Sequence, residues 1–421
     1  MTKRQLKLGL VTTGVGGPGQ TNRWLDPEIP VDASVDIDWY IDIVRQAEAA
    51  KFDLVLIVDS QFITADSPPH YLNRLEPLTL LSALAVATSH IGLVGTLTTS
   101  YNEPFNLARR LASLDLISKG RAGWNVVTSG DTGTAGNYSR DEHYDYATRY
   151  GRAFEYLDVV RGLWRSYEDG ALVHDRATGV FLDKTRLHAL NHKGEHFSVV
   201  GPLNIQRSLQ GEPVIFQAGD SEQGRTLGAT VADAIFTHAR TIEQGQAFYA
   251  DIQRRAVALG RGPDAILILP GFTITIGDTD ADAHAIERAH RRIDQSFDQA
   301  LAEFGRAFGW HDFRQVRYRR ALSGSRARTR KEQLLHPGQA HHQSGGRARL
   351  VAAADGRAST RPVYQPVRGI RRDRGRRDRA LVRGAGVRRD QRPRRPSEPV
   401  PALYPGGRPV AAGARTVPQR L

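Results

Sequence analysis

The chain contains no cysteine among its 421 residues. This absence excludes a disulfide framework, a thiol nucleophile and a cysteine-ligated metal site. No apolar stretch approaches the roughly 20 residues that a membrane-spanning helix needs. The N-terminal segment also lacks the apolar core of a signal peptide. We therefore expect a cytoplasmic protein that does not cross a membrane.

Charge is distributed unevenly along the chain. Residues 1–310 hold 30 basic and 38 acidic residues, whereas residues 311–421 hold 28 basic and 7 acidic ones. All five tryptophans lie in the first part. In residues 311–421, leucine, isoleucine, valine and phenylalanine make up only 18 of 111 positions, which is low for a folded domain. We expect an enzyme domain over 1–310 and a disordered tail over 311–421.

The composition of the tail suggests how it arose. Its excess of arginine, glycine, alanine and proline is typical of a GC-rich gene that is read out of frame, so we favour a reading-frame shift near residue 313. The alternative is a basic tail that binds nucleic acid nonspecifically through its phosphates. Because we favour the frame shift, a nucleic-acid partner is not expected.

Short apolar runs alternate with helical patterns throughout the first part. Strands are predicted over residues 6–12, 52–58, 91–96, 122–127, 213–218, 234–237 and 266–276. Helices are predicted over residues 36–50, 77–88, 104–117, 145–166, 221–230, 242–259 and 280–304, and an irregular insertion over 168–212. Strict alternation indicates a parallel sheet, and we predict an α/β fold of the TIM-type (β/α)₈ class, incomplete at its C-terminal end. A doubly wound open sheet is the alternative, although its GxGxxG turn is missing.

In a barrel, catalytic groups lie at the C-terminal ends of the strands. Here these positions hold small hydroxyls, amides and a carboxylate, which suits a cofactor that brings its own reactivity. Histidines 188, 192 and 196 are spaced by four, but Asn191 and Gly194 argue against a helix, so no metal site is expected.

Gly219 and Ser221 join a predicted strand to a predicted helix. Free backbone N–H groups at the start of a helix favour an anion, so this turn is a candidate phosphate site. The alternative is an ordinary serine N-cap. Arg225, one turn further on, either adds positive charge to the site or is a surface residue.

Two segments, residues 76–129 and 192–225, resemble the flavin-dependent branch of the bacterial luciferase-like monooxygenases. The resemblance is strongest to the group that acts on nitrilotriacetate, EDTA and dibenzothiophene sulfone. It implies a TIM-type barrel that oxygenates a small organic substrate with O₂ through a flavin C4a-hydroperoxide. It also implies reduced FMN from a separate NAD(P)H-dependent flavin reductase, and a homo-oligomer in intact members.

The resemblance also implies roles for individual residues. Asp59 resembles the aspartate that contacts the flavin, and Thr96 resembles the threonine beside the isoalloxazine ring. Asn125 is an amide in an apolar strand, and a flavin edge could satisfy it. Each residue also has a structural alternative. Asp59 could be a turn residue, Thr96 a β-branched strand residue, and Asn125 part of a polar network inside the barrel.

The helix after the fourth strand carries a His-x-x-x-Tyr pair in the family. Tyr150 fits this pattern, but Tyr146 stands where histidine is usual. His143, about one turn earlier, is a partial substitute, and helix packing is the alternative role of both tyrosines. No catalytic residue is assigned.

Two other functions stay open. One is a non-catalytic flavin-binding relic with a tail that binds nucleic acid. The other is an F420-dependent oxidoreductase on the same barrel, which the two matching segments disfavour. The residues do not identify the substrate.

Overall fold

A computed structural model describes residues 5–17, 22–262 and 264–293, together with residues 298, 301, 304–305 and 311–313. All of them belong to the first of two compact units, residues 1–364. Nearly all of the basic tail, including residues 314–421, lies outside the described residues, so its predicted disorder stays a prediction.

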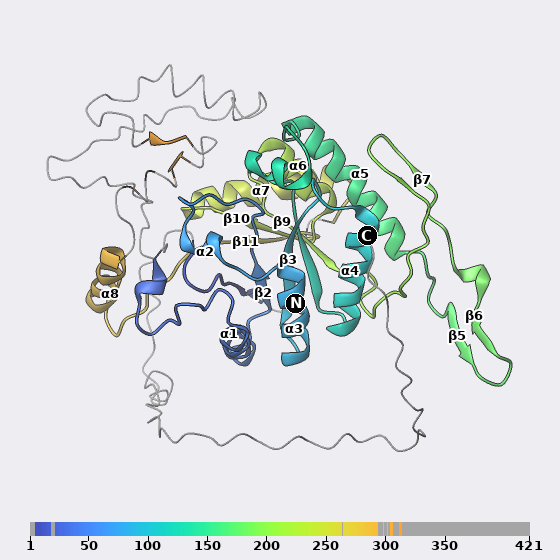
Figure 1. The fold of residues 1–421 in the computed structure, drawn as a ribbon, viewed down its shortest axis with the longest axis horizontal. Coiled ribbons are helices and arrows are strands. Elements are labelled where there is room, and N and C mark those ends of the chain that lie inside the picture. Colours follow the sequence, from blue (N-terminus) through green and yellow to red (C-terminus); the bar gives the residue numbers. More distant parts are fainter. Residues whose placement is uncertain are drawn as a thin grey trace, which may run out of the picture. The chain divides into compact units, whose positions relative to one another are not determined.

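The core of the fold is a seven-stranded parallel sheet with its strands in chain order (Figure 1). Its strands are β1 (Gly9–Val11), β2 (Leu54–Ile57), β3 (Gly92–Thr98), β4 (Ala122–Val127), β9 (Val214–Gln217), β10 (Ala234–Thr237) and β11 (Leu267–Pro270). The sheet curves into a nearly closed barrel. Since a doubly wound sheet reverses its strand order, the observed order excludes that alternative, and all seven predicted strands are present in this sheet.

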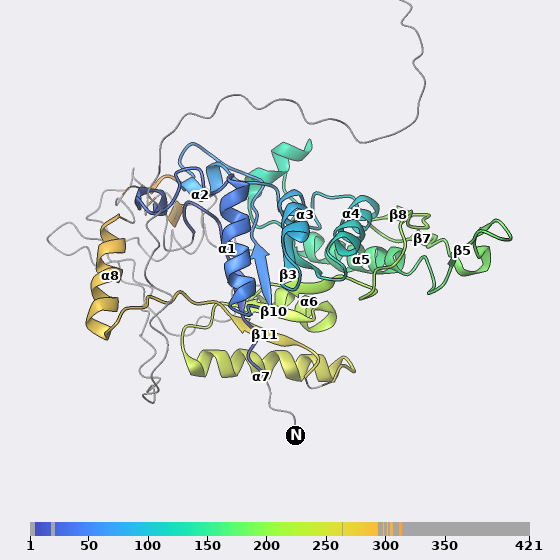
Figure 2. The ribbon, with the colours of Figure 1, turned by 90° about the horizontal axis from the view of Figure 1, so that it is seen from below.

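Helices follow the strands and cover the outer face of the sheet (Figure 2). These covering helices are α1 (Ile37–Ala49), α3 (Pro77–Ala87), α4 (Pro104–Ile117), α5 (Tyr146–Trp164), α6 (Glu222–Val231) and α7 (Ile242–Ala258). The short helix α2 (Pro69–Leu72) lies in the loop after β2, and α8 (Asp280–Ile293) follows β11 and contacts the 3₁₀ turn η1 (Arg23–Leu25). The other 3₁₀ turns are η2 (Thr132–Tyr138) and η3 (Lys184–Arg186). Side-chain caps begin several helices; Asp36, Glu76 and Thr241 each accept a backbone N–H of the first turn. No helix in the described part is both long and apolar enough to span a membrane.

Alternation along the strands separates two apolar layers. Trp124 of β4 and Leu93 of β3 are fully buried against the surrounding helices. Val94 and Phe216 point to the opposite face and form a buried cluster inside the barrel. Because side chains alternate along a strand, Thr96 and Asn125 share that inner face.

The sheet has two edges within the described part, β1 and β11, and no described strand pairs with their outer sides. The sequence predicted a strand over 266–276, but β11 ends at Pro270. Beyond it, Phe272, Ile274 and Ile276 are 66–81% exposed. No described strand pairs with residues 272–276, so their backbone groups gain no sheet hydrogen bonds there, which explains why the observed strand is short.

The insertion between α5 and β9 is less irregular than the sequence indicated. It contains two small antiparallel hairpins, formed by β5 (Leu172–Asp175) with β6 (Val180–Leu182) and by β7 (His192–Lys193) with β8 (Ser198–Val199). Figures 1 and 2 both show the β5–β6 hairpin projecting away from the barrel.

Glu155 of α5 attaches the β7–β8 hairpin to the barrel. Its carboxylate accepts hydrogen bonds from His192 Nε2 and from the backbone N–H groups of His196 and Phe197, all at 2.9 Å. His188 instead bonds to Glu168 at 2.6 Å. The side chains of His188 and His192 therefore bond to different carboxylates, and the described residues contain no group of three potential metal ligands.

We predict that Glu155→Ala loosens the insertion. Burial raises the pKa of the Glu155 carboxyl group, but the hydrogen bonds outweigh burial and hold that pKa below its ordinary value. The carboxylate therefore stabilises the fold fully above about pH 4.5, and this contribution is lost as the pH falls through the lower folded-state pKa. At pH 7 the substitution should lower the free energy of unfolding by about 1–3 kcal/mol and speed proteolysis within residues 168–212. Exposed Glu195 in the same insertion is the matched control; equal effects of Glu195→Ala would contradict the assignment.

Candidate functional site

The parallel register of β3 and β4 places Thr96 directly opposite Asn125. Both side chains are buried, and Asn125 Nδ2 donates a 3.0 Å hydrogen bond to Thr96 Oγ1. Asn125 Oδ1 is also buried, but no group in the described part donates to it. An unsatisfied buried carbonyl oxygen costs about 1–3 kcal/mol, so this position favours a ligand with an N–H or O–H donor.

Asp59 lies two residues beyond the end of β2. Burial raises the pKa of its carboxyl group, although the positive charge of Arg74 and the backbone N–H of Ser60 oppose the shift. Burial, and then the charge of Asp59, also raise the pKa of the Tyr138 phenol at the end of η2. This interaction between Asp59 and Tyr138 indicates that the loop after β2 lies near the loop after β4.

The loops that follow β2 and β4 also touch directly. Asn137 Nδ2 of η2 donates a 2.8 Å hydrogen bond to the Gln61 carbonyl oxygen. The loop of residues 60–75 and η2 therefore meet beyond the C-terminal ends of β2 and β4.

Tyr146 and Tyr150 converge on Ser221 from the neighbouring helix. The Tyr146 hydroxyl donates to Ser221 Oγ at 2.5 Å, and the Tyr150 hydroxyl lies 3.4 Å from the same atom. Ser221 Oγ also accepts the backbone N–H of Gly224 at 3.1 Å, so the serine caps α6. The N-cap role is confirmed, and the two tyrosine hydroxyls add polar groups beside it.

Gly219 crosses close to the first turn of α6. A Cβ on Gly219 would lie 2.8 Å from Gly224 Cα, so a larger residue would push the loop and the helix apart. The Gly219 N–H itself is bonded to Gln217 Oε1 at 2.8 Å. Arg225 turns away toward α7 and pairs with Asp251 at 3.1 Å, which makes it a structural residue.

The structure adds a polar cluster that the sequence did not predict. The Tyr101 hydroxyl is hydrogen-bonded to His143 Nδ1, and His143 Nε2 lies 2.9 Å from the Ser129 carbonyl oxygen. Arg149 also donates to that oxygen. The left-handed backbone of Ser129, with φ of 50°, turns its carbonyl toward these donors. His143 thus joins the loops after β3 and β4, while Tyr146 contacts Ser221.

Comparison with known proteins identifies the fold. The family model described as luciferase-like monooxygenase matches residues 19–353. The chain belongs to this luciferase-like family. N-acetyl-S-(2-succino)cysteine monooxygenase of Bacillus subtilis (strain 168) is 47% identical over 283 residues, and nitrilotriacetate monooxygenase component A of Aminobacter aminovorans is 42% identical over 299 residues. Each match covers 67% of this chain and 64% of the relative, so the chain spans less than two thirds of their length.

Solved structures agree with the sequence comparison. Long-chain alkane monooxygenase has a TM-score of 0.72 at 30% identity, with 77% of this chain and 76% of that chain covered. Riboflavin lyase, whose structure contains modified FMN, has a TM-score of 0.69 at 29% identity, with 75% and 72% covered. The luciferase-like family is flavin-dependent, so FMN is the ligand to test against this site.

The luciferase-like site fits FMN in two respects. The buried Asn125 Oδ1 offers an acceptor to a ring N–H, and the start of α6 offers backbone N–H groups and the Ser221 hydroxyl to a phosphate. Thr96, Asn125, Tyr146, Tyr150, Gly219 and Ser221 all lie near the C-terminal ends of β3, β4 and β9 or on the adjoining helices. Their contacts with a flavin stay predictions.

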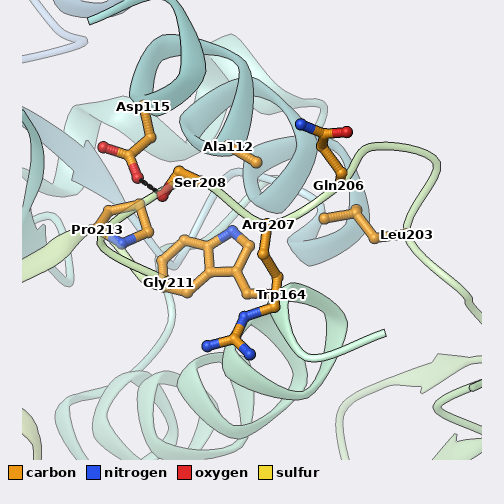
Figure 3. A pocket seen from close by; sticks show the side chains of 9 residues that line it. All are labelled: Ala112, Asp115, Trp164, Leu203, Gln206, Arg207, Ser208, Gly211 and Pro213. Atoms are coloured by element: carbon orange, nitrogen blue, oxygen red, sulfur yellow. Dashed lines mark hydrogen bonds between the residues drawn. The ribbon is translucent and has the colours of Figure 1, made fainter. Parts of the chain in front are cut away.

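The pocket drawn in Figure 3 is a different feature. Asp115 of α4 accepts hydrogen bonds from the Ser208 hydroxyl, the Gln210 amide and the Ala122 N–H. Ala122 begins β4, so this cavity of about 10 Å³ lies at the opposite end of the strand from the candidate site. Such a volume holds one water molecule at most. Burial raises the pKa of Asp115, and the three donors oppose that shift.

We predict that a single substitution in the Thr96–Asn125 pair lowers stability more than a double substitution does. Thr96→Val removes the partner of the buried Asn125 amide and should lower the free energy of unfolding by about 1–3 kcal/mol. Thr96→Val with Asn125→Leu removes both polar groups and should change it by less than about 1 kcal/mol. Urea denaturation of the flavin-free protein measures both. A double variant that is less stable than the single one would show that the apo protein satisfies Asn125 Oδ1.

Proposed function

We propose that this chain is built as the oxygenating component of a two-component monooxygenase. It would bind reduced FMN supplied by a separate NAD(P)H-dependent flavin reductase and oxygenate a small organic substrate with O₂. The observation that carries the proposal is the buried polar layer at the C-terminal end of a luciferase-like barrel, where Asn125 Oδ1 has no donor among the described residues. Reduced flavin, when bound, would supply the electrons that activate O₂, and O₂ would supply the oxygen atom.

The chain's own residues would position the cofactor and exclude water. Ser221, Tyr146 and the first turn of α6 would hold the phosphate, and Asn125 would orient the ring. Asp59, whose raised pKa reflects its low-polarity surroundings, would lie at the ring on the β2 side. Loop 60–75, bonded to η2 through Asn137, would shield the site, because solvent access promotes wasteful breakdown of reactive intermediates.

The names of the relatives support oxygenation without fixing a substrate. Two relatives are named for succinocysteine and nitrilotriacetate, and others for dibenzothiophene sulfone, long-chain alkanes and dimethyl sulfide. Component A of nitrilotriacetate monooxygenase implies at least one further component for that enzyme. We extend that arrangement to this chain as part of the proposal.

We also propose that residues 311–421 replace the end of the barrel after a reading-frame shift near residue 313. The eighth strand and helix of the family would normally follow β11 and α8. Their loss would leave β1 and β11 as exposed edges, and we expect this product to be unstable or inactive. Translation of the gene in the other two frames after codon 310 is the test. If neither frame gives an apolar strand followed by a helix, the frame-shift hypothesis fails.

The function is tested with the whole chain, FMN, a flavin reductase, NADH and O₂. Candidate substrates are those of the named relatives, and product formation is measured by mass spectrometry with ¹⁸O₂. Incorporation of one labelled atom, by this chain or by a frame-restored version, supports the proposal. Saturable flavin binding without oxygenation by either version would instead support the non-catalytic relic.

A further inference from the structure

Three arginines border the candidate site without a carboxylate partner. Arg140 lies after η2, and Arg149 and Arg152 lie on α5. Within the described part, none of them forms an ion pair. At the other end of the same helix, Arg161 and the C-cap residue Arg165 both pair with Glu212, at 3.6 and 2.6 Å. The unpaired charges thus gather at the end of α5 that faces the site.

Arg149 is the most buried of the three, with 7% of its surface exposed. It donates to the carbonyl oxygens of Thr128 and Ser129, while its Nε is buried without a partner. The nearby Asp145 carboxylate is occupied by the Thr148 N–H and hydroxyl. Burying a cation that lacks a counter-ion is costly, and burial accordingly lowers the pKa of Arg149.

Arg152 and Arg140 are held by aromatic rings. The Arg152 guanidinium carbon lies 4.3 Å from the centre of the Phe197 ring and 5.5 Å from that of Tyr144. The Arg140 guanidinium carbon lies 3.9 Å from the Tyr144 ring centre. Stacking on a ring fixes the plane of a guanidinium and leaves its N–H edges free for an oxyanion. Arg152 makes no hydrogen bond within the described part, and its Nε is buried.

The arginines adjoin the residues that would hold the flavin. Arg149 lies between Tyr146 and Tyr150 in the sequence, and its guanidinium carbon is 5.6 Å from the centre of the Tyr146 ring. Burial raises the pKa of the Tyr101 phenol, and the positive charges of Arg140 and Arg149 act to lower it. Tyr101 itself lies 6.0 Å from Tyr144, ring centre to ring centre.

We propose that Arg140, Arg149 and Arg152 form a recognition site for the carboxylate groups of an anionic substrate. The proposal rests on the proposed function and narrows its substrate to small organic di- or tricarboxylates. Arginine forks match carboxylate oxygens in pairs. Arg149 and Arg152 are also three residues apart on one helix, where like charges repel, so a multivalent anion would relieve the repulsion. The nearby acidic groups are Asp141, Glu142 and Asp145, all exposed, and the charge of Asp145 acts to raise the pKa of Arg149. None of the three forms an ion pair with these arginines within the described part.

The experiment measures binding of tricarballylate, a simple tricarboxylate, to the whole chain by isothermal titration calorimetry at constant ionic strength. Its neutral trimethyl ester and inorganic phosphate are the comparison ligands. The variants are Arg152→Gln and the matched control Arg165→Gln. Arg165 is the C-cap residue of the same helix, and its exposed side chain is paired to Glu212. FMN affinity is measured on the same samples.

We expect tricarballylate to bind at least tenfold more tightly than its ester. Arg152→Gln should weaken it at least tenfold and Arg165→Gln less than twofold, with FMN affinity unchanged by Arg152→Gln. Equal binding of acid and ester, or equal effects of the two variants, would overturn the proposal. A preference for phosphate together with weaker FMN binding by Arg152→Gln would also overturn it, because the arginines would then serve the cofactor phosphate. Loss of FMN binding by the unsubstituted chain would count against the proposed function, not against the carboxylate site.

Discussion

The candidate site depends on the parallel register of β3 and β4, which sets Thr96 opposite Asn125. A shift of one residue in the strand register would put Leu97 and Trp124 in the places of these side chains. The polar groups would then point into the apolar layer under the helices. Burial of Trp124 on the outer face therefore fixes the register that places Asn125 on the inner face. The hydrophobic layer and the polar site are consequences of one strand pairing.

Helix packing imposes a second constraint on the same site. Hydrogen bonds between the Ser221 hydroxyl and the hydroxyls of Tyr146 and Tyr150 join α5 to α6 at the C-terminal ends of the strands. Ser221 thereby caps a helix and contributes to a candidate phosphate site with the same atom. The nearby cluster of Tyr101, His143 and Arg149 joins the loops after β3 and β4, so the helix faces and the loops position one another.

The sequence predicted the parts of this structure that follow from local patterns. Alternating apolar runs gave seven strands in their observed order, and the polar residues at their ends were found where expected. Long-range contacts could not be predicted: His143 bonds to Tyr101, 42 residues away, and Glu155 reaches residues 192–197. The predicted strand over 266–276 was too long, because strand length depends on a neighbour, and β11 has only β10 within the described part.

The central claim is that Ser221 contributes to flavin binding in addition to capping α6. FMN titration followed by fluorescence quenching, compared between Ser221→Ala and Thr241→Ala, tests it most directly. Thr241 caps α7 in the same way, so both substitutions should cost about 1 kcal/mol of stability. We predict about tenfold weaker FMN binding for Ser221→Ala, equivalent to about 1.4 kcal/mol, and less than a twofold change for Thr241→Ala. Equal FMN affinities in the two variants would contradict the account.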